Sequence, residues 1–226
     1  MVNRVFEHAN LDIGYSDLDT DTTPERRLYV APDGSKYPSV TTVLSILSED
    51  SIRAWRARVG EEEANKISHR ASNRGTAVHS IIEDYLNNEP TDDYLPHVKQ
   101  SLQNLRPILD KSIGKILGLE TALYSKHLGL AGRCDCIAEF DGVPSIIDFK
   151  TSRRIKKKES ISNYFAQMSA YAIMFEERTG MPITNTVIIM DVDNERPIVF
   201  KEHRDNYTKL LLETKAEYDR RQMFHG

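Results

Sequence analysis

The stretch GRCDCIAEFDGVPSIIDFKTS, residues 132–152, decides the fold of this chain. It contains two extended segments joined by Asp-Gly at 141–142, a dipeptide that favours a two-residue hairpin turn. Such a turn places Phe140 opposite Val143, so the residue numbers of every facing pair add up to 283. Pro144 lacks an N–H group and is the one residue that disfavours this register. The stretch predicts a β-hairpin.

This register places two acidic and two basic side chains on one face of the hairpin. Asp135 faces Asp148, and Arg133 faces Lys150, because both pairs add up to 283. The opposite face is small or apolar, as a core face should be, and carries Cys134, Cys136, Ala138, Ile147 and Phe149. Turn chemistry and hydrophobic pattern therefore favour the same register.

Two carboxylates that face each other across a hairpin repel unless a cation lies between them. Oxygen ligands of this kind suit one or two ions of Mg²⁺ or Mn²⁺, which leave positions open for water and phosphate. Lys150, on the same face, is then placed to orient an attacking water and to stabilise negative charge in the transition state. The alternative is an exposed strand face with ordinary salt bridges.

Composition and charge limit the classes of protein to which this chain can belong. A chain of 226 residues with 39% hydrophobic content is long enough for one well-cored domain. The net charge of −4 excludes a general coat for nucleic acid but permits a local cationic groove. No apolar run of roughly 18 residues spans a bilayer, and residues 1–21 are acidic. We expect no membrane partner and a cytoplasmic protein, in the host cytoplasm if the source is viral.

The two cysteines, Cys134 and Cys136, are one residue apart on a predicted strand, a spacing that is poor for a disulfide. Two thiols also cannot supply the four ligands of a closed zinc or iron–sulfur site. We expect small core residues and no iron–sulfur cluster.

The rest of the chain predicts a mixed α/β domain, with a central mixed sheet flanked by helices and a helical region before it. Residues 1–27 are expected to form a loosely attached acidic arm, and 28–226 a single domain that is mainly helical over 28–112 and carries the sheet over 113–226. Before the hairpin stretch we expect two short strands around Pro32–Gly34, followed by a short helix capped by Thr41 or Thr42. We then expect helices over 51–88, with a boundary or bend at Gly60 and Gly75, and a further helix over about 97–109. After it we expect a helix over 160–179, strands over 186–192 and 196–200, and a closing helix over 204–222.

Two helical motifs accompany the hairpin stretch. The upstream segment RGTAVHSIIEDYL, 74–86, has Gly75 and His79 as G-x-x-x-H, and the downstream segment YFAQMSAYA, 164–172, has Gln167 and Tyr171 as Q-x-x-x-Y. Together they resemble the RecB-like branch of the PD-(D/E)XK nuclease superfamily. YPSVTTVLS and AWRARVGEEEA add a likeness to its mitochondrial genome maintenance exonuclease-like and bacteriophage exonucleases, over about 28–171.

The resemblance implies a restriction-endonuclease-like core and assigns roles to residues. Lys150 becomes the catalytic lysine beside Asp135 and Asp148. The implied metal ligands are His79, Asp135, Asp148 and the backbone carbonyl of Phe149, with Glu83 and Glu120 as further candidates. On their own residues, His79 and Glu120 are as compatible with a polar packing residue and a surface carboxylate. Gln167 and Tyr171 share a helix face and are candidates to contact Lys150 or the DNA backbone, with a core position for Tyr171 as the alternative.

Candidate DNA-contacting residues follow the hairpin directly. Residues 151–158, TSRRIKKK, hold five cations in eight positions. The residues expected to bind substrate here are Thr151, Ser152, Arg153, Arg154 and Lys156, joined by Arg74 from the preceding helices. A solvated basic face is the alternative. The related exonucleases imply a helical arch over 51–74, where Trp55 either stacks on bases or belongs to the core.

These features predict a Mg²⁺- or Mn²⁺-dependent deoxyribonuclease that acts as an exonuclease on single-stranded DNA ends, in replication, repair or recombination. The first alternative is a structure-specific endonuclease that uses the same site. The second is a non-catalytic nucleic-acid-binding module that keeps the nuclease fold.

Overall fold

A five-stranded mixed sheet forms the centre of the computed structural model, which describes residues 4–9, 11–22 and 27–225. Its strand order is β4-β5-β6-β7-β8, and only β6 and β7 run parallel. The strands are β4 Ile113–Ser125, β5 Leu130–Phe140, β6 Val143–Ser152, β7 Asn185–Val192 and β8 Ile198–His203. The predicted mixed α/β fold is confirmed.

The β5–β6 hairpin has the predicted register. Its paired residues run from Phe140 opposite Val143 to Cys136 opposite Ile147, and every pair adds up to 283. Pro144 lies opposite Glu139 without displacing the turn. The ladder ends at Cys136, so the acidic residues next along each strand lie just beyond the last pair, where the strands no longer hold each other in register.

The prediction for the faces of the hairpin is wrong at Cys134. Cys136 packs with Ala138, Ile147 and Phe149, but Cys134 packs in the core on the other side of the sheet. Both cysteines are buried free thiols. Regular alternation fails here because the neighbouring strand is irregular: Glu120, between the partners of Cys136 and Cys134, has a φ of 45°.

Arg133 also departs from its predicted partner. Its guanidinium donates to the backbone carbonyl of Glu120 and to the carboxylate of Asp17, and does not face Lys150. The reason is again that the β5–β6 ladder stops before it reaches this residue. Arg133 therefore braces the irregular part of β4.

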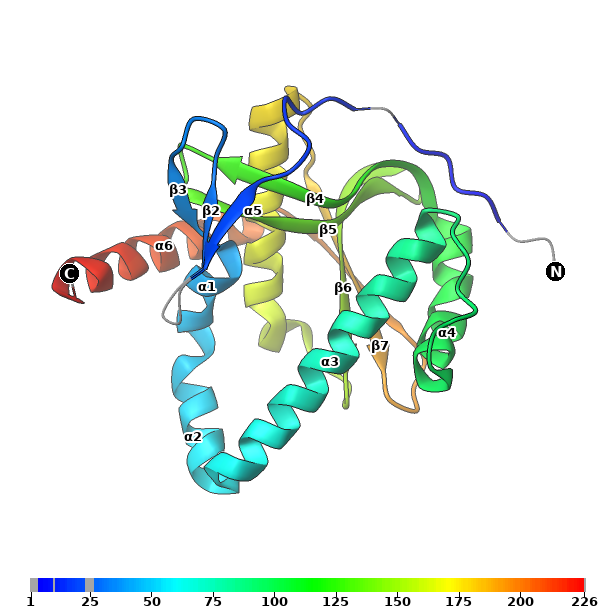
Figure 1. Cartoon of the computed structure of the whole chain (residues 1–226), viewed down its shortest axis with the longest axis horizontal. Helices are drawn as coiled ribbons and strands as arrows, with labels where there is room; N and C mark the ends of the chain where they lie inside the picture. The colour runs from blue at the N-terminus through cyan, green and yellow to red at the C-terminus, as the bar shows by residue number, and fades with distance from the viewer. Residues whose placement is uncertain (1–3, 10, 23–26, 226) are drawn as a thin grey trace.

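Helices cover both faces of the sheet (Figure 1). One face packs against α5 Ser162–Thr179 and the short α1 Val40–Leu44, with part of α6 Asp205–His225 behind them. The other face packs against α3 Glu61–Leu86 and α4 Pro96–Ser112, through buried residues such as Ile81 and Leu105. Short 3-10 helices, η1 Ser45–Ser48 and η2 Lys158–Ile161, connect the layers. The sheet is thus enclosed between two apolar layers, as its strand composition requires.

The N-terminal helical region differs in detail from the prediction. Ser39 caps α1, since its Oγ accepts from the Thr42 N–H at 3.0 Å, in place of the expected Thr41 or Thr42. Gly60, with a φ of 87°, separates α2 Glu49–Val59 from α3. Gly75 lies inside α3 and is no boundary.

The expectation of a loosely attached arm is wrong for residues 4–9 and 11–22. Phe6 is buried against α3 and α4, and Ile116 exchanges backbone hydrogen bonds with Glu7 and Ala9. A three-stranded sheet follows, formed by β1 Asp19–Thr22, β2 Arg27–Val30 and β3 Lys36–Pro38. Its β1–β2 pairing crosses the expected boundary at residue 27.

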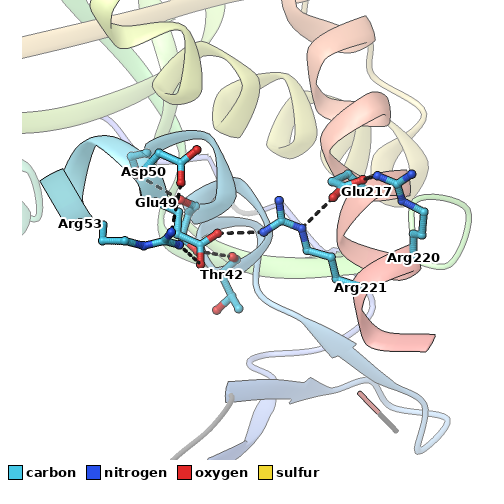
Figure 2. A network of polar contacts seen from close by, with 9 residues as sticks. Thr42, Glu49, Asp50, Arg53, Glu217, Arg220 and Arg221 are labelled. Atoms are coloured by element: carbon cyan, nitrogen blue, oxygen red, sulfur yellow. Dashed lines mark hydrogen bonds and ion pairs between the residues drawn. The ribbon is translucent and has the colours of Figure 1, made fainter. Parts of the chain in front are cut away.

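Helix α2 and the first half of α3 form a V that stands away from the sheet (Figure 1). None of the eleven residues of α2, all of them described, is buried. A polar network ties the start of α2 to α6: Arg221 contacts Glu49 at 2.8 Å and Glu217 at 2.7 Å (Figure 2). One leg of the V is thereby anchored. Among the described helices, none has the length and apolar character needed to cross a bilayer.

Candidate active site

Three side chains that could ligate a metal ion, one each from α3, β4 and β5, lie close together. Donor atoms of His79, Glu120 and Asp135 all lie within 4.8 Å of one another. His79 Nδ1 is 3.5 Å from Asp135 Oδ2, and the imidazole packs edge-on against the Phe149 ring. The structure thus brings the histidine of the upstream motif to the acidic hairpin.

Glu120 has the most unusual backbone of these three residues. A φ of 45° is rare for a residue with a side chain and indicates local strain that the surrounding structure must hold in place. Burial raises the pKa of its carboxyl to about 7, with the charges of Asp135 and Glu83 adding to the effect. Glu120 is partly buried and lies with His79 and Asp135, so it is not an isolated surface carboxylate.

Asp135 is positioned by the neighbouring strand. Its Oδ2 accepts a hydrogen bond of 2.9 Å from the Phe149 N–H, which places the carboxylate beside the Asp148–Phe149 peptide. The two aspartates are therefore close, although the hairpin ladder has already ended.

Asp148 forms a buried ion pair with Lys150. Asp148 Oδ2 lies 2.6 Å from Lys150 Nζ, and the two side chains are 2% and 20% exposed. Burial raises the pKa of Asp148, an effect that the Lys150 charge opposes and the Asp135 charge reinforces. Burial disfavours the charge of Lys150, but Asp148 and Asp135 outweigh it and raise the pKa of that ammonium. The two carboxylates therefore favour the charged form of Lys150.

Helix α5, which covers the face of the sheet opposite α3, contacts this ion pair directly. Gln167 Nε2 donates long hydrogen bonds of 3.4 Å to Asp148 Oδ1 and to the Tyr171 hydroxyl. Tyr171 is buried at 3% exposure and fills the space beside Gly132, where an added Cβ would lie 2.9 Å from its ring. Gln167 therefore contacts Asp148 and not the expected Lys150, and Tyr171 occupies the core position that was the alternative.

A cavity of about 320 Å³ opens onto the cluster of His79, Glu120 and Asp135. Glu83, one helical turn after His79 on α3, also lines it. The cavity gives a solvated approach to the three donor groups, and Glu83 faces the same space as the sequence suggested.

A second cavity, of about 240 Å³, lies between α3 and the end of β6. It is lined by Ile67, Arg70, Ala71, Arg74, Thr151, Ser152, Arg153 and Asp193. Thr151, Ser152 and Arg153 thus gather at one opening, while Arg154 is exposed just beyond it. Lys156 bends back, and its Nζ lies 3.4 Å from the Tyr164 hydroxyl.

Arg74 forms ion pairs within the protein. One of its terminal nitrogens is 2.9 Å from Asp191 Oδ2, and the other pairs with Asp193. Asp191 is buried at 2% exposure and also accepts from the Ser101 hydroxyl at 2.6 Å. The predicted role of Arg74 in DNA contact does not account for these bonds, which lock α3 and α4 to the end of β7.

Asp191 and Tyr164 lie near the site but were not predicted from the sequence. Asp191 lies next to the end of the apolar strand β7, and its contacts with Arg74 and Ser101 set it apart. Tyr164 lies one turn before Gln167 on α5, and both Lys150 and Lys156 approach its ring. The spacing of three between Tyr164 and Gln167 is the signal that was present in the sequence.

The donor set fits a divalent cation. One imidazole and two carboxylates suit Mn²⁺ well and Mg²⁺ through the oxygens. Burial is the main cause of the raised pKa of Glu120, and the nearby charges of Asp135 and Glu83 add to it. The structure therefore places an acidic cluster, whose charges a cation would neutralise, next to a buried aspartate–lysine pair.

This chain belongs to the PD-(D/E)XK nuclease superfamily, whose sequence pattern matches residues 97–222, more than half of its length. Its mixed sheet is the restriction-endonuclease-like core that this membership implies.

Among curated proteins, the chain is similar to the human Mitochondrial genome maintenance exonuclease 1, with 27% identity over 154 residues. The match covers 62% of this chain and 44% of the human protein, so the chain spans less than half of that relative's length. A solved structure from Eubacterium rectale, described as a candidate exonuclease, aligns with a TM-score of 0.46 and 17% identity over 65% of each chain.

Proposed function

We propose that this protein is a Mg²⁺- or Mn²⁺-dependent deoxyribonuclease that degrades DNA from single-stranded ends. The observation that carries the proposal is the convergence of His79, Glu120 and Asp135 within 4.8 Å, beside the buried Asp148–Lys150 pair. Membership of a nuclease superfamily and the exonuclease named among the relatives agree with it.

The proposed ligands are His79, Glu120 and Asp135. Asp148, the Phe149 carbonyl and Glu83 are further candidate ligands for one or two ions. A divalent cation held there supplies Lewis-acid polarisation of the phosphate and lowers the pKa of water. Asp135 is preset for this role, since the Phe149 N–H already fixes its orientation. Gln167 fixes Asp148 in the same manner from α5.

Lys150 is the proposed catalytic cation. Its ammonium is charged, only a fifth exposed and held against Asp148, so little reorganisation is required when charge develops on the phosphate. It is placed to hold the attacking water and to stabilise the negative charge of the transition state.

The proposed substrate path follows the basic loop and the V of α2 and α3. Arg153 and Arg154 are exposed beside the end of β6, and Arg70 faces the same cavity. Trp55 is half-buried on α2, which leaves part of its ring accessible for stacking on an unpaired base. We propose that this V is the helical arch that the resemblance implies and that it contacts single-stranded DNA.

End-labelled oligonucleotides test the proposal. Strands labelled at the 5′ or the 3′ end are incubated with Mg²⁺, Mn²⁺ or EDTA, and we expect cleavage only with metal and progressive release from one end. A covalently closed single-stranded circle separates the modes: an exonuclease leaves it intact, whereas cutting of the circle would replace the proposal with an endonuclease.

The intact set of Asp135, Asp148 and Lys150 disfavours the second alternative, a non-catalytic nucleic-acid-binding module. DNA binding without cleavage under every metal condition would establish that alternative instead. A role in replication, repair or recombination, a bacteriophage source, a cytoplasmic location and the treatment of 28–226 as a single nuclease domain remain predictions.

A further inference from the structure

Two lysines of the site share one aromatic ring. Lys150 Nζ lies 5.1 Å and Lys156 Nζ 5.5 Å from the centroid of the Tyr164 ring. Lys156 Nζ is also 3.4 Å from the Tyr164 hydroxyl, at the long end of hydrogen bonding. Tyr164 is therefore the only side chain shown in contact with both lysines among the described residues.

The place of Tyr164 on α5 makes this contact rigid. Tyr164, Gln167 and Tyr171 follow one another at spacings of three and four, so they lie on one face of the helix. Gln167 contacts Asp148, and Tyr171 packs on Gly132 of β5. The same helix face thus supports both members of the Asp148–Lys150 pair.

The ring and the hydroxyl of Tyr164 have different contacts. Lys150 is only a fifth exposed, and an aromatic face attracts an ammonium most strongly where water is scarce. The hydroxyl reaches Lys156, which belongs to the basic loop after β6. The ring therefore contacts both ammonium groups, whereas the hydroxyl contacts Lys156 and not Lys150.

We propose that Tyr164 is a positioning residue: its ring holds Lys150 against Asp148, and its hydroxyl ties Lys156 of the basic loop to the same point. The inference rests on the proposed nuclease function. Loss of the ring should lower kcat, because Lys150 acts on the reacting phosphate. Loss of the hydroxyl should raise KM, because Lys156 contacts DNA outside the reacting phosphate.

The test compares Tyr164→Phe, which keeps the ring, with Tyr164→Met, which keeps apolar bulk without one. Steady-state cleavage of an end-labelled single strand is measured with Mn²⁺. We expect Tyr164→Phe to keep kcat within about twofold and to raise KM, and Tyr164→Met to lower kcat about 10-fold, equivalent to about 1.4 kcal/mol. Equal kcat values for the two variants, whether unchanged or equally reduced, would overturn the proposal.

A matched control comes from the far side of α5. Tyr207 of α6 stacks on Phe165 at 4.9 Å and contacts neither lysine. Tyr207→Met should lower Tm but leave kcat unchanged, which separates positioning from general stability. If Tyr207→Met lowers kcat as much as Tyr164→Met does, the ring of Tyr164 has no special role.

A second measurement does not depend on activity or on the folding of Tyr164→Met. In protein carrying ¹³C-labelled lysine, the Hε signals of Lys150 should show a ring-current shift in the wild type and in Tyr164→Phe. Unshifted Lys150 signals in the wild type would overturn the proposal directly. Absence of all cleavage by the wild type would reject the nuclease function, whereas wild-type cleavage with equal variants rejects only the role of Tyr164.

Discussion

His79 Nδ1 lies 3.5 Å from Asp135 Oδ2, which joins a helix residue to a strand residue far along the chain. The imidazole of His79, next to two acids, offers a nitrogen ligand where the carboxylates offer oxygens. Because Asp135 is also bonded to the Phe149 N–H, movement of α3 would change the geometry of the whole cluster. We therefore expect the position of α3 on the sheet to set the metal affinity of the proposed site.

Removal of His79 should weaken metal binding. His79→Ala deletes one of three clustered donors, and we expect Mn²⁺ affinity to fall by at least about 10-fold. The rise in Tm on addition of Mn²⁺ should shrink accordingly. His69→Ala, an exposed histidine on the same helix, is the control and should behave as the wild type. An unchanged Mn²⁺ response in His79→Ala would remove this residue from the ligand set.

Lys150→Met should abolish most cleavage while it spares DNA binding. Loss of a preorganised cation that stabilises transition-state charge typically lowers kcat by about 10² to 10³. Binding of a single strand, measured by anisotropy in EDTA, should change less than about threefold. Lys209→Met serves as control, since that side chain is 84% exposed on α6. Full cleavage by Lys150→Met would contradict the proposed site.

The raised pKa of Glu120 predicts how pH acts on the metal-free protein. Burial, followed by the charges of Asp135 and Glu83, raises this pKa to about 7, so folding favours the protonated acid. That stabilising contribution is complete below about pH 4.5, the ordinary pKa, and is lost as pH rises through 7. Metal binding requires the ionised form, so the gain in Tm from Mn²⁺ should grow between about pH 6 and pH 8.

Glu120→Gln provides the check on this pH dependence. The variant should flatten the fall in metal-free Tm across that window and should lose most of the stabilisation by Mn²⁺. Glu213→Gln, an exposed acid on α6, should keep the wild-type profile. A Glu120→Gln profile that parallels the wild type would assign the titration to another group.

Arg74 should prove to be a stability residue. Arg74→Ala leaves the buried Asp191 without its cationic partner, and we expect a loss of about 2 kcal/mol in the free energy of unfolding. For a chain of this size that corresponds to a fall in Tm of about 4–8 °C. The double variant Arg74→Ala, Asp191→Asn should recover part of the loss, because the uncompensated charge is gone.

The neighbouring Arg70→Ala is the natural comparison for Arg74→Ala. Arg70 is exposed on the same helix and lines the same cavity. Its removal should raise KM for DNA without a change in Tm. An Arg74→Ala protein with wild-type Tm and raised KM would return Arg74 to the DNA-contacting role that the sequence suggested.

What the sequence determined by itself is the hairpin and the family to which it belongs. The register from Phe140–Val143 to Cys136–Ile147 follows from one turn dipeptide and the alternation of side chains, and both are local properties. The motif residues His79, Asp135, Asp148 and Lys150 were recognisable for the same reason, since each has a characteristic spacing within a short segment.

What only the tertiary structure decided depends on contacts between distant segments. The strained backbone of Glu120, the change of side at Cys134 and the pairing of Arg74 with Asp191 each require a neighbour from another element. The packing of Phe6 and the sharing of Tyr164 by two lysines are of the same kind. Local propensity and spacing carry no information about such partners, because burial and charge pairing are set only when the layers close on the sheet.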